Sequence, residues 1–265
     1  MAELADGWTA GSAYEDFMGR WSRELAPKFV GWLQIAADSH WLDVGCGTGA
    51  MTDAICKHAN PASVIGCDPA RPFIDYARDR QSGECASFVL AGFGSLPCRA
   101  GGFGSVTSCL ALNFFPEPAR SVVEMREITA SGGTVSSSVW DYSGRMEFLR
   151  FFWDTASRIN PNAAELDEGE RFPICRADAL TELFREAGLR AVRCDPIEMS
   201  TGFSSFDEYW GSFLGGSGPA PSYVASINDD HRKALVEELE KVLPIDPDGS
   251  IRLTARAWAV RGTAG

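Results

Sequence analysis

The chain has 265 residues, 45% of them hydrophobic, and a formal net charge of −12. This length and composition suffice for one large α/β domain with a buried core, and they exclude disorder as the default state. The acidic balance argues against binding of nucleic-acid phosphates, which requires clustered Lys and Arg. No apolar run reaches the roughly 18 residues of a membrane span, and the acidic start lacks the basic region of a secretory signal. We therefore expect a cytoplasmic protein with neither a nucleic-acid nor a membrane partner.

The cysteines and histidines predict no metal site. No two of the eight cysteines form a C-x-x-C pair, and the three histidines are scattered along the chain. We expect eight free thiols in a reducing compartment, with several of them buried as small hydrophobic side chains. A reactive thiol at Cys46 is an alternative to a packing role, since reactivity depends on exposure and pKa. The cysteines are Cys46, Cys56, Cys67, Cys85, Cys98, Cys109, Cys175 and Cys194.

The first predicted element is an N-terminal helix. Apolar residues repeat at helical spacing from Leu25 to Ala36, and a lead-in segment with Tyr14 and Arg20 precedes them.

A strand and a glycine-rich loop come next. Residues 41–49 begin with an apolar run that ends in Asp43, and Gly45, Gly47 and Gly49 then alternate before a helix that starts at Ala50. A strand, a tight glycine turn and a helix N-terminus are typical of a nucleotide-cofactor cradle, because glycines let the backbone approach a ligand closely. A carboxylate at the strand end suits an amino-acid ammonium group better than a pyrophosphate.

A second acid ends the next predicted strand. Asp68 closes the run 63–68 and stands 25 residues after Asp43 (68 − 43), which is one strand-helix-strand unit along the chain. In that geometry a carboxylate accepts hydrogen bonds from ribose hydroxyls. The alternative is that both acids simply end buried strands.

The loop and the two acids resemble motif I and its following acid in class I S-adenosylmethionine-dependent methyltransferases, in the small-molecule, type 11-like branch. Dinucleotide-binding folds usually show Gly-x-Gly-x-x-Gly, which is not the spacing of Gly45, Gly47 and Gly49. The resemblance implies S-adenosyl-L-methionine as cofactor and S-adenosyl-L-homocysteine as product. It is most specific at residues 41–49 and 64–68, covers most of the chain, and is vague after residue 140.

Two positions depart from this family. After a third predicted strand at residues 86–90, the family typically places an Asp-Ala pair whose carboxylate accepts from the adenine amino group, whereas this chain has Gly92 and Phe93. The missing bond is worth on the order of 1 kcal/mol. Gly104 replaces a second acid that is usually structural. Both departures leave room for a protein that binds the cofactor without turning it over.

The fourth and fifth predicted strands point to the acceptor side. The fourth runs over residues 104–110, and Asn113 follows its carboxyl end, where open α/β sheets place ligands; a turn-forming Asn is the alternative. A helix over 118–129 leads to the fifth strand at 134–140. Asp141 directly after it is a candidate acceptor-orienting carboxylate or general base, or else a helix cap.

The remaining elements complete the expected fold. We predict an aromatic-rich segment at 144–160, a helix at 177–187, a sixth strand at 189–199, a helix at 230–243 and a final strand at 251–260. The aromatic residues either form a packed core or line a pocket for an apolar acceptor.

The order of elements predicts an α/β, Rossmann-like, doubly wound seven-stranded sheet that is mostly parallel, with an antiparallel final strand by family resemblance. We expect one methyltransferase domain over 1–265. Its parts are N-terminal lid helices (1–38), a cofactor-binding core (39–141), a continuation with acceptor-side helices (142–200), a cap insertion (202–249) and the final strand (250–262).

The resemblance also implies site residues. Asp43 would hold the cofactor amino group, the glycine loop its methionine part, Asp68 the ribose and Arg20 the carboxylate. The full cofactor set is Tyr14, Arg20, Asp43, Gly45, Cys46, Gly47, Gly49, Asp68, Pro69, Phe73, Gly92, Phe93, Leu110 and Asn113, and the catalytic candidates are Asp141, Asn113 and Tyr14. We expect methyl transfer to a small apolar or aromatic molecule by in-line attack. A non-catalytic cofactor-binding protein, a nicotinamide oxidoreductase and a protein methyltransferase are the alternatives. The sequence indicates neither the acceptor atom nor the oligomeric state.

Overall fold

The structure is a computed structural model that describes residues 15–80, 84–215 and 218–265. These residues fall into two compact units. The core unit contains residues 21–140, 174–197 and 257–265, and the second unit contains the described parts of 1–20, 141–173 and 198–256. The boundary between them runs within the last two strands. The expectation of one domain with a separate cap at 202–249 stays a prediction, and Tyr14 lies outside the described residues.

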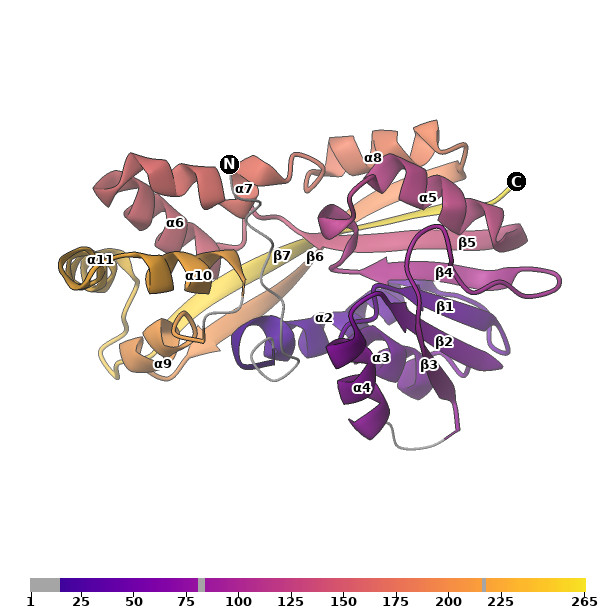
Figure 1. Cartoon of the computed structure of the whole chain (residues 1–265), viewed down its shortest axis with the longest axis horizontal. Coiled ribbons are helices and arrows are strands. Elements are labelled where there is room, and N and C mark those ends of the chain that lie inside the picture. The colour runs from indigo at the N-terminus through magenta and orange to yellow at the C-terminus, as the bar shows by residue number, and fades with distance from the viewer. Residues whose placement is uncertain (1–14, 81–83, 216–217) are drawn as a thin grey trace. The chain divides into compact units, whose positions relative to one another are not determined.

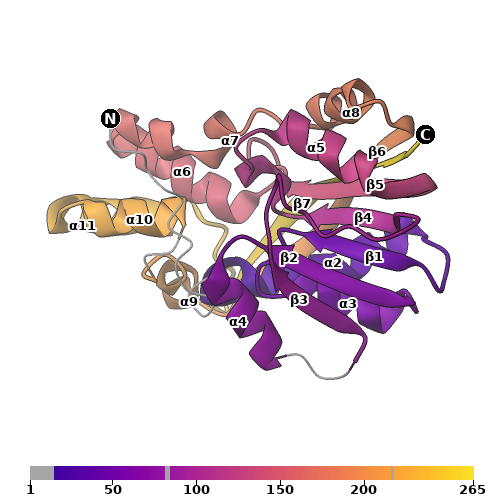
Figure 2. The ribbon, with the colours of Figure 1, turned by 45° about the vertical axis from the view of Figure 1, so that its right-hand side comes forward.

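A seven-stranded sheet with the order β3-β2-β1-β4-β5-β7-β6 confirms the predicted fold class. The pairs β1–β2, β1–β4, β2–β3 and β4–β5 are parallel, and β7 runs antiparallel to β5. Figure 2 shows β3, β2, β1, β4 and β5 in succession across the core unit. The strands are β1 (His40–Val44), β2 (Ser63–Asp68), β3 (Ala86–Leu90), β4 (Phe103–Cys109), β5 (Thr129–Trp140), β6 (Arg190–Phe203) and β7 (Ile251–Thr263).

Five helices accompany the strands in the described part of the core unit. Figure 1 shows α3 and α4 beside β2 and β3, and α5 and α8 together near β5. A guanidinium nitrogen of Arg126 on α5 donates to the carbonyl of Ala187 at the end of α8, at 2.5 Å. The helices are α2 (Arg20–Leu33), α3 (Ala50–His58), α4 (Arg71–Arg80), α5 (Pro118–Glu127) and α8 (Ala177–Glu186), and a short 3₁₀ turn, η2 (Leu112–Phe114), follows β4.

Strand β5 begins five residues earlier than predicted, at Thr129 instead of Thr134. Residues 131–133 form an irregular part of this strand, where Gly132 has a φ of 77° and the register against β4 shifts between the pairs Phe103–Thr129 and Ser105–Thr134. The end of the chain pairs with this irregular part. The Gly132 amide donates to the Ala264 carbonyl at 3.0 Å, and the Ala264 amide donates to the Gly133 carbonyl at 2.9 Å. The sequence of a Ser-Gly-Gly segment cannot show that a distant segment satisfies its backbone.

The second unit is built from a π-helical turn η1 (Glu15–Gly19), α6 (Glu147–Ile159), η3 (Pro161–Leu166), α7 (Glu168–Arg171), α9 (Phe206–Gly211), α10 (Pro219–Ser226) and α11 (Asp229–Val242). Its centre is a set of buried rings that we call the aromatic cluster, and Phe152 and Phe213 stack there at 4.4 Å between centroids. The members, all at most 3% exposed, are Phe17, Phe148, Phe152, Phe203, Tyr209 and Phe213. Since these rings pack on one another, they form a core of their own unit.

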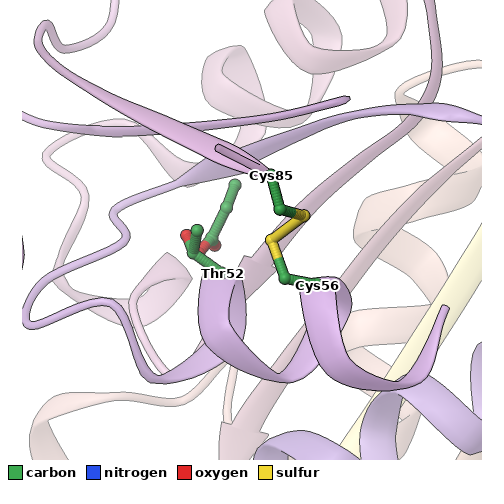
Figure 3. The surroundings of a disulfide bond; sticks show 4 residues. Thr52, Cys56 and Cys85 are labelled. Atoms are coloured by element: carbon green, nitrogen blue, oxygen red, sulfur yellow. A yellow bond between two sulfur atoms is a disulfide. The ribbon is translucent and has the colours of Figure 1, made fainter. Parts of the chain in front are cut away.

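The expectation of eight free thiols is wrong for two cysteines. Cys56 at the end of α3 forms a disulfide with Cys85, which directly precedes β3 (Figure 3). The two residues are 29 positions apart, so the pairing depends on the strand-helix-strand unit that brings them together. A bridge that closes a loop of this length stabilises a fold by about 3 to 4 kcal/mol, on the chain-entropy estimate. The other six cysteines are free.

Candidate functional site

The glycine loop (residues 45–49) joins β1 to α3 in a conformation that glycine permits. Gly45, Gly47 and Gly49 have φ of 71°, 51° and 88°, in the left-handed region that other residues rarely adopt. A Cβ on Gly45 would also lie 2.7 Å from the Cβ of Ala111. Hence Gly45 is required by both its dihedral angle and its contact with the segment that follows β4.

The end of β2 holds the loop through its backbone and through Asp68. The amides of Gly45 and Cys46 donate to the carbonyl of Cys67 at 2.8 and 3.0 Å. Asp68 accepts from the Gly47 amide at 3.1 Å and from the Ala70 amide at 2.8 Å, with one carboxylate oxygen for each. Burial raises the pKa of Asp68, and these two amide bonds oppose the rise. Each oxygen keeps further lone pairs that can accept from a ligand hydroxyl.

Asp43 is a fully buried acid with half of its carboxylate unsatisfied. The Thr52 hydroxyl on α3 donates to Oδ2 at 2.7 Å, whereas Oδ1 meets no hydrogen-bond partner among the described residues. Burial raises the pKa of Asp43 to about 7, with a smaller rise from the charge of Asp68 and a lowering by the Thr52 bond. A buried carboxylate oxygen without a partner is costly, so this atom is where a ligand donor is expected.

The segment after β4 presents a second set of unsatisfied buried atoms. Asn113 is 5% exposed, and neither its Nδ2 nor its Oδ1 has a hydrogen-bond partner within the described residues. Leu110, three residues before it, has a φ of 59°, a strained value for this residue type that is seen most often at functional sites. The Phe115 ring would lie 3.3 Å from a Cβ on Gly45. This segment and the glycine loop are therefore in direct contact.

The turn after β3, which the resemblance assigns to adenine, is held by partners on two sides. The Gly94 amide donates to both carboxylate oxygens of Glu124 on α5, at 3.0 and 2.9 Å. The Phe93 ring meets the Phe115 ring edge-on at 4.5 Å between centroids. Gly92 leaves space where a Cβ would contact only Pro69, at 3.3 Å. The Phe93–Phe115 ring pair thus lies beside Gly92, the position at which the resemblance leads one to expect a carboxylate.

The structure brings the strand-end residues together in the core unit. Asp43 lies one residue before the carboxyl end of β1, Asp68 is the last residue of β2, and Asn113 follows β4; these three strands are neighbours in the sheet. Pro69 is exposed directly after Asp68, and Phe73 is half-buried on α4. Cys46 packs with Ile74, Ala77 and Phe88, and burial raises its thiol pKa, so this thiol stays protonated and packs as a hydrophobe.

Two predicted residues belong to the second unit, where each has partners. Arg20 donates to the Glu208 carboxylate at 2.6 Å and lies 4.5 Å from the centre of the Phe203 ring. Asp141 accepts from the Arg145 amide at 3.1 Å and lies 3.5 Å from an Arg256 nitrogen. Their assignments to cofactor and acceptor stay predictions.

Three residues of this region were missed in the sequence. Thr52, Glu124 and Phe115 act through contacts with Asp43, Gly94 and the glycine loop, which come from elements well separated along the chain. Of these three, only Thr52 could have been found from the sequence, because it lies in the first turn of the helix that follows the loop. Across residues 15–80, 84–215 and 218–265, no group of three or more His, Cys, Asp or Glu side chains could hold a metal ion. No helix in the same ranges is long and apolar enough to cross a bilayer.

Part of the sequence that forms this site matches a known protein family. Residues 42–137, from β1 into β5, match the family model described as a methyltransferase domain, type 11. These residues form a class I S-adenosylmethionine-dependent methyltransferase domain of the type 11 kind. The match includes the glycine loop, Asp43, Asp68 and Asn113.

Two relatives and one solved structure are similar to this methyltransferase domain. Malonyl-[acyl-carrier protein] O-methyltransferase of Acetivibrio thermocellus is 27% identical over 161 residues, covering 59% of this chain and 55% of that protein. Demethylmenaquinone methyltransferase of Lactiplantibacillus plantarum is 30% identical over 105 residues, covering 38% and 44%. The matches therefore span about half of the length of these relatives. Phosphoethanolamine N-methyltransferase 2 of Haemonchus contortus, in complex with S-adenosyl-L-methionine, shares the fold with a TM-score of 0.58 and 12% identity, covering 100% of this chain and 58% of that one.

S-adenosylmethionine is the cofactor of the methyltransferase domain, and the residues present fit it. The orphaned Oδ1 of Asp43 is a buried anionic acceptor that matches an ammonium group. The left-handed φ values of Gly45, Gly47 and Gly49 shape a loop whose backbone can approach a ligand closely, and a Cβ on Gly47 would meet nothing within 4 Å.

Proposed function

We propose that this protein transfers the methyl group of S-adenosylmethionine to a small-molecule acceptor. The observation that carries the proposal is that two groups near the carboxyl ends of neighbouring strands are buried and unsatisfied among the described residues: Oδ1 of Asp43 and the whole side-chain amide of Asn113. Asp43 lies near the carboxyl end of β1 and Asn113 follows that of β4, at the edge where ligands bind in sheets of this kind.

Asp43 would bind the ammonium group of the cofactor. The Thr52 hydroxyl occupies Oδ2 at 2.7 Å and thereby directs Oδ1 toward the ligand. A charge-assisted hydrogen bond in this dry position contributes more than a neutral one. It also restores the ionised state of a carboxyl whose burial raises its pKa to about 7.

Asp68 and the turn after β3 would bind the nucleoside. The Asp68 oxygens are already oriented by the amides of Gly47 and Ala70, so their remaining lone pairs are positioned for the two ribose hydroxyls. Phe93, packed on Phe115, offers a ring face or edge to adenine, and the backbone near Gly92 replaces the absent carboxylate.

Asn113 would face the acceptor or the reacting methyl group. When bound, S-adenosylmethionine supplies an electrophilic methyl group, and the protein's task is to hold the acceptor in line with it. A primary amide can both donate to and accept from an acceptor, which suits orientation of a polar acceptor atom. Asp141 and Tyr14 remain proposals as acceptor-side residues, and Arg20 remains one for the cofactor carboxylate.

The acceptor would be a small apolar or aromatic molecule. The net charge of −12 disfavours nucleic acid, which calls for a basic surface. The two relatives are named for a carrier-bound malonyl group and for demethylmenaquinone, and the latter name supports an apolar acceptor. The aromatic cluster no longer supports one, because its rings fill their own core.

Isothermal titration with S-adenosylmethionine, S-adenosylhomocysteine and NADH tests the cofactor assignment. We expect micromolar binding of both adenosyl ligands, loss of this binding in Asp68→Ala, and no binding of NADH. Asp75→Ala, which removes an exposed acid on α4, is the matched control and should bind like the wild type. Binding of NADH alone would replace the proposal with the oxidoreductase alternative.

A screen with methyl-labelled S-adenosylmethionine tests turnover. Labelled product with any small apolar acceptor supports methyl transfer. Tight cofactor binding with no transfer to small molecules or to arrayed peptides would favour the non-catalytic alternative, which the absent carboxylate at Gly92 allows.

A further inference from the structure

The disulfide ties together two elements that surround the buried carboxyl of the cofactor site. Cys56 lies in the last turn of α3, whose first turn receives the chain from the glycine loop, and Cys85 directly precedes β3 (Figure 3). The Cys85 carbonyl accepts from the Val64 amide at 3.1 Å, so this end of the bridge is also fixed to β2.

On the helix side, the bridge restrains the face that contacts Asp43. Thr52 and Cys56 are four residues apart on α3, and residues at this spacing share a helix face. Figure 3 shows both side chains on α3, on the side of the helix that carries the bridge to Cys85. The Thr52 hydroxyl donates to Asp43 at 2.7 Å.

On the strand side, β3 contributes the ring that fills the space under the loop. Phe88, three residues after Cys85, would lie 2.7 Å from a Cβ on Gly66 and 3.1 Å from one on Gly49. The Thr52 hydroxyl would lie 2.9 Å from the same Cβ on Gly66. Thr52 and Phe88 thus meet over Gly66, the residue paired with Asp43 in the sheet. A movement of α3 relative to the sheet would displace the Thr52 hydroxyl from Asp43 on β1.

The two cysteines of the bridge are more exposed than the thiols of the cofactor site. Cys56 and Cys85 are half-buried, whereas Cys46 and Cys67 beside the site are buried. Exchange therefore takes place at the bridge without a thiol of the cofactor site being attacked.

We propose that Cys56–Cys85 is a thiol–disulfide exchange site whose redox state sets the affinity for S-adenosylmethionine, because the bridge holds the Thr52 hydroxyl against Asp43. This inference rests on the proposed function of the site. A soluble dithiol is the reductant: one of its thiolates attacks a sulfur of the bridge, and its second thiol resolves the mixed disulfide. Two electrons pass to the protein, Cys56 and Cys85 become thiols, and the reductant becomes a disulfide.

The pH profile of binding separates this mechanism from a general loosening of the fold. The Thr52 bond lowers the pKa of Asp43, so reduction shifts the apparent pKa for cofactor binding upward. The other ionisable groups facing Asp43 are Asp68 at the end of β2 and the thiols of Cys46, Cys67 and Cys109. Burial raises the pKa values of these thiols, and the charge of Asp43 adds a smaller rise. Burial keeps these thiols neutral, so they leave the profile near pH 7 unchanged.

The test is titration of S-adenosylhomocysteine into the full-length protein, oxidised and after incubation with dithiothreitol, below the melting temperature of each form. Reduction should weaken binding three- to tenfold and move the midpoint of its pH dependence upward. Cys56→Ser should match the reduced protein and not respond to dithiothreitol. Cys98→Ser, which removes an exposed free thiol, is the matched control and should respond like the wild type.

Thr52→Val tests whether the bridge acts on binding through the Thr52–Asp43 contact. We expect weak binding that is the same in both redox states, because the contact through which the bridge acts is gone. Equal affinity of oxidised and reduced wild type, with a lower melting temperature on reduction, would overturn the proposal and leave the bridge a purely stabilising one. Absence of binding in both forms would overturn it together with the proposed function. If Cys56→Ser does not fold, the proposal is tested by comparing the oxidised and reduced forms of the wild type with those of Thr52→Val.

Discussion

The glycine loop region and the aromatic cluster are both buried, yet they satisfy their polar groups in opposite ways. In the aromatic cluster, the Tyr209 hydroxyl donates to the Phe148 carbonyl at 3.0 Å and the rings fill the remaining space against one another. Around the glycine loop, Asp43 and Asn113 keep buried polar atoms with no partner among the described residues. Native cores seldom tolerate such atoms. The comparison teaches that unsatisfied polar groups near the carboxyl ends of neighbouring strands, and not the abundance of aromatic side chains, point to the ligand site.

The largest expected effect separates the two regions. Phe213→Ala removes a fully buried ring from the aromatic cluster and should lower the free energy of unfolding by about 4 kcal/mol, as large-to-small changes in cores do. The affinity for S-adenosylhomocysteine should change little, because Asp43, the glycine loop and Asp68 lie in the core unit. Denaturant unfolding and calorimetric titration measure the two quantities. A large loss of affinity in a folded variant would show that the aromatic cluster contributes to the site after all.

A glycine series sharpens the loop side of the comparison. Gly45→Ala combines a left-handed φ with a contact at 2.7 Å, and Gly47→Ala has the left-handed φ but open space. We expect about 2 to 3 kcal/mol of destabilisation and lost cofactor binding for Gly45→Ala, and about 1 kcal/mol for Gly47→Ala. Gly211→Ala, with neither strain nor contact, is the control and should be neutral or slightly stabilising. Equal effects at positions 45 and 47 would contradict the role given to the Ala111 contact.

The pH dependence follows from the pKa of about 7 at Asp43. Below pH 7 the carboxyl must lose a proton to bind an ammonium group, so affinity for S-adenosylhomocysteine should fall about tenfold per unit. At high pH the ligand's own ammonium group loses its charge in turn, and affinity should fall again. Titrations from pH 5 to 9 check this profile, and a flat profile below pH 7 would contradict the pairing.

The free protein should show the opposite trend in stability. A raised pKa in the folded state favours folding below the unfolded value and loses this contribution as pH rises through the folded value. Burial raises the pKa of Glu168 to about 7 as well, so both acids act in the same direction. The free energy of unfolding of the ligand-free protein should be lower at pH 7.5 than at pH 5, and Asp43→Asn should reduce that difference.

The smallest expected effect on stability is at Asn113. Asn113→Leu replaces a buried amide that has no described partner, so the free energy of unfolding should change by less than about 1 kcal/mol or rise. Methyl transfer should fall at least tenfold while cofactor affinity stays within threefold. Separate measurements of the kcat of methyl transfer and of the Kd for the cofactor show whether only the first changes. A strongly destabilised variant would instead assign Asn113 to the turn.

The sequence was sufficient for the sheet and for the glycine loop because both depend on local patterns. Alternating glycines after Asp43 force a turn whichever partners surround it, and apolar runs at 41–44 and 63–68 match β1 and β2 closely. Asp68 followed from the same unit of strand, helix and strand. The strand boundaries at Thr129 and Phe203 did not, because pairing with distant segments sets them.

The sequence was insufficient where a property depends on contacts between distant segments. The Cys56–Cys85 bridge requires the end of α3 to lie beside the start of β3, which residue spacing alone does not reveal. Whether the side chain of Asn113 has hydrogen-bond partners depends on all of its neighbours in the fold, which the sequence does not give. Likewise, the same aromatic residues predict a core or a pocket equally well until the ring contacts are known.

The central claim is that the cofactor's ammonium group meets Oδ1 of Asp43. The most direct measurement compares S-adenosylhomocysteine with its analogue that lacks the amino group, titrated into the wild type and into Asp43→Asn. The wild type should bind the analogue about 10- to 100-fold more weakly, as expected for loss of a charge-assisted bond, and Asp43→Asn should bind the two ligands with nearly equal affinity. Equal discrimination by both proteins would contradict the claim and require another partner for the amino group.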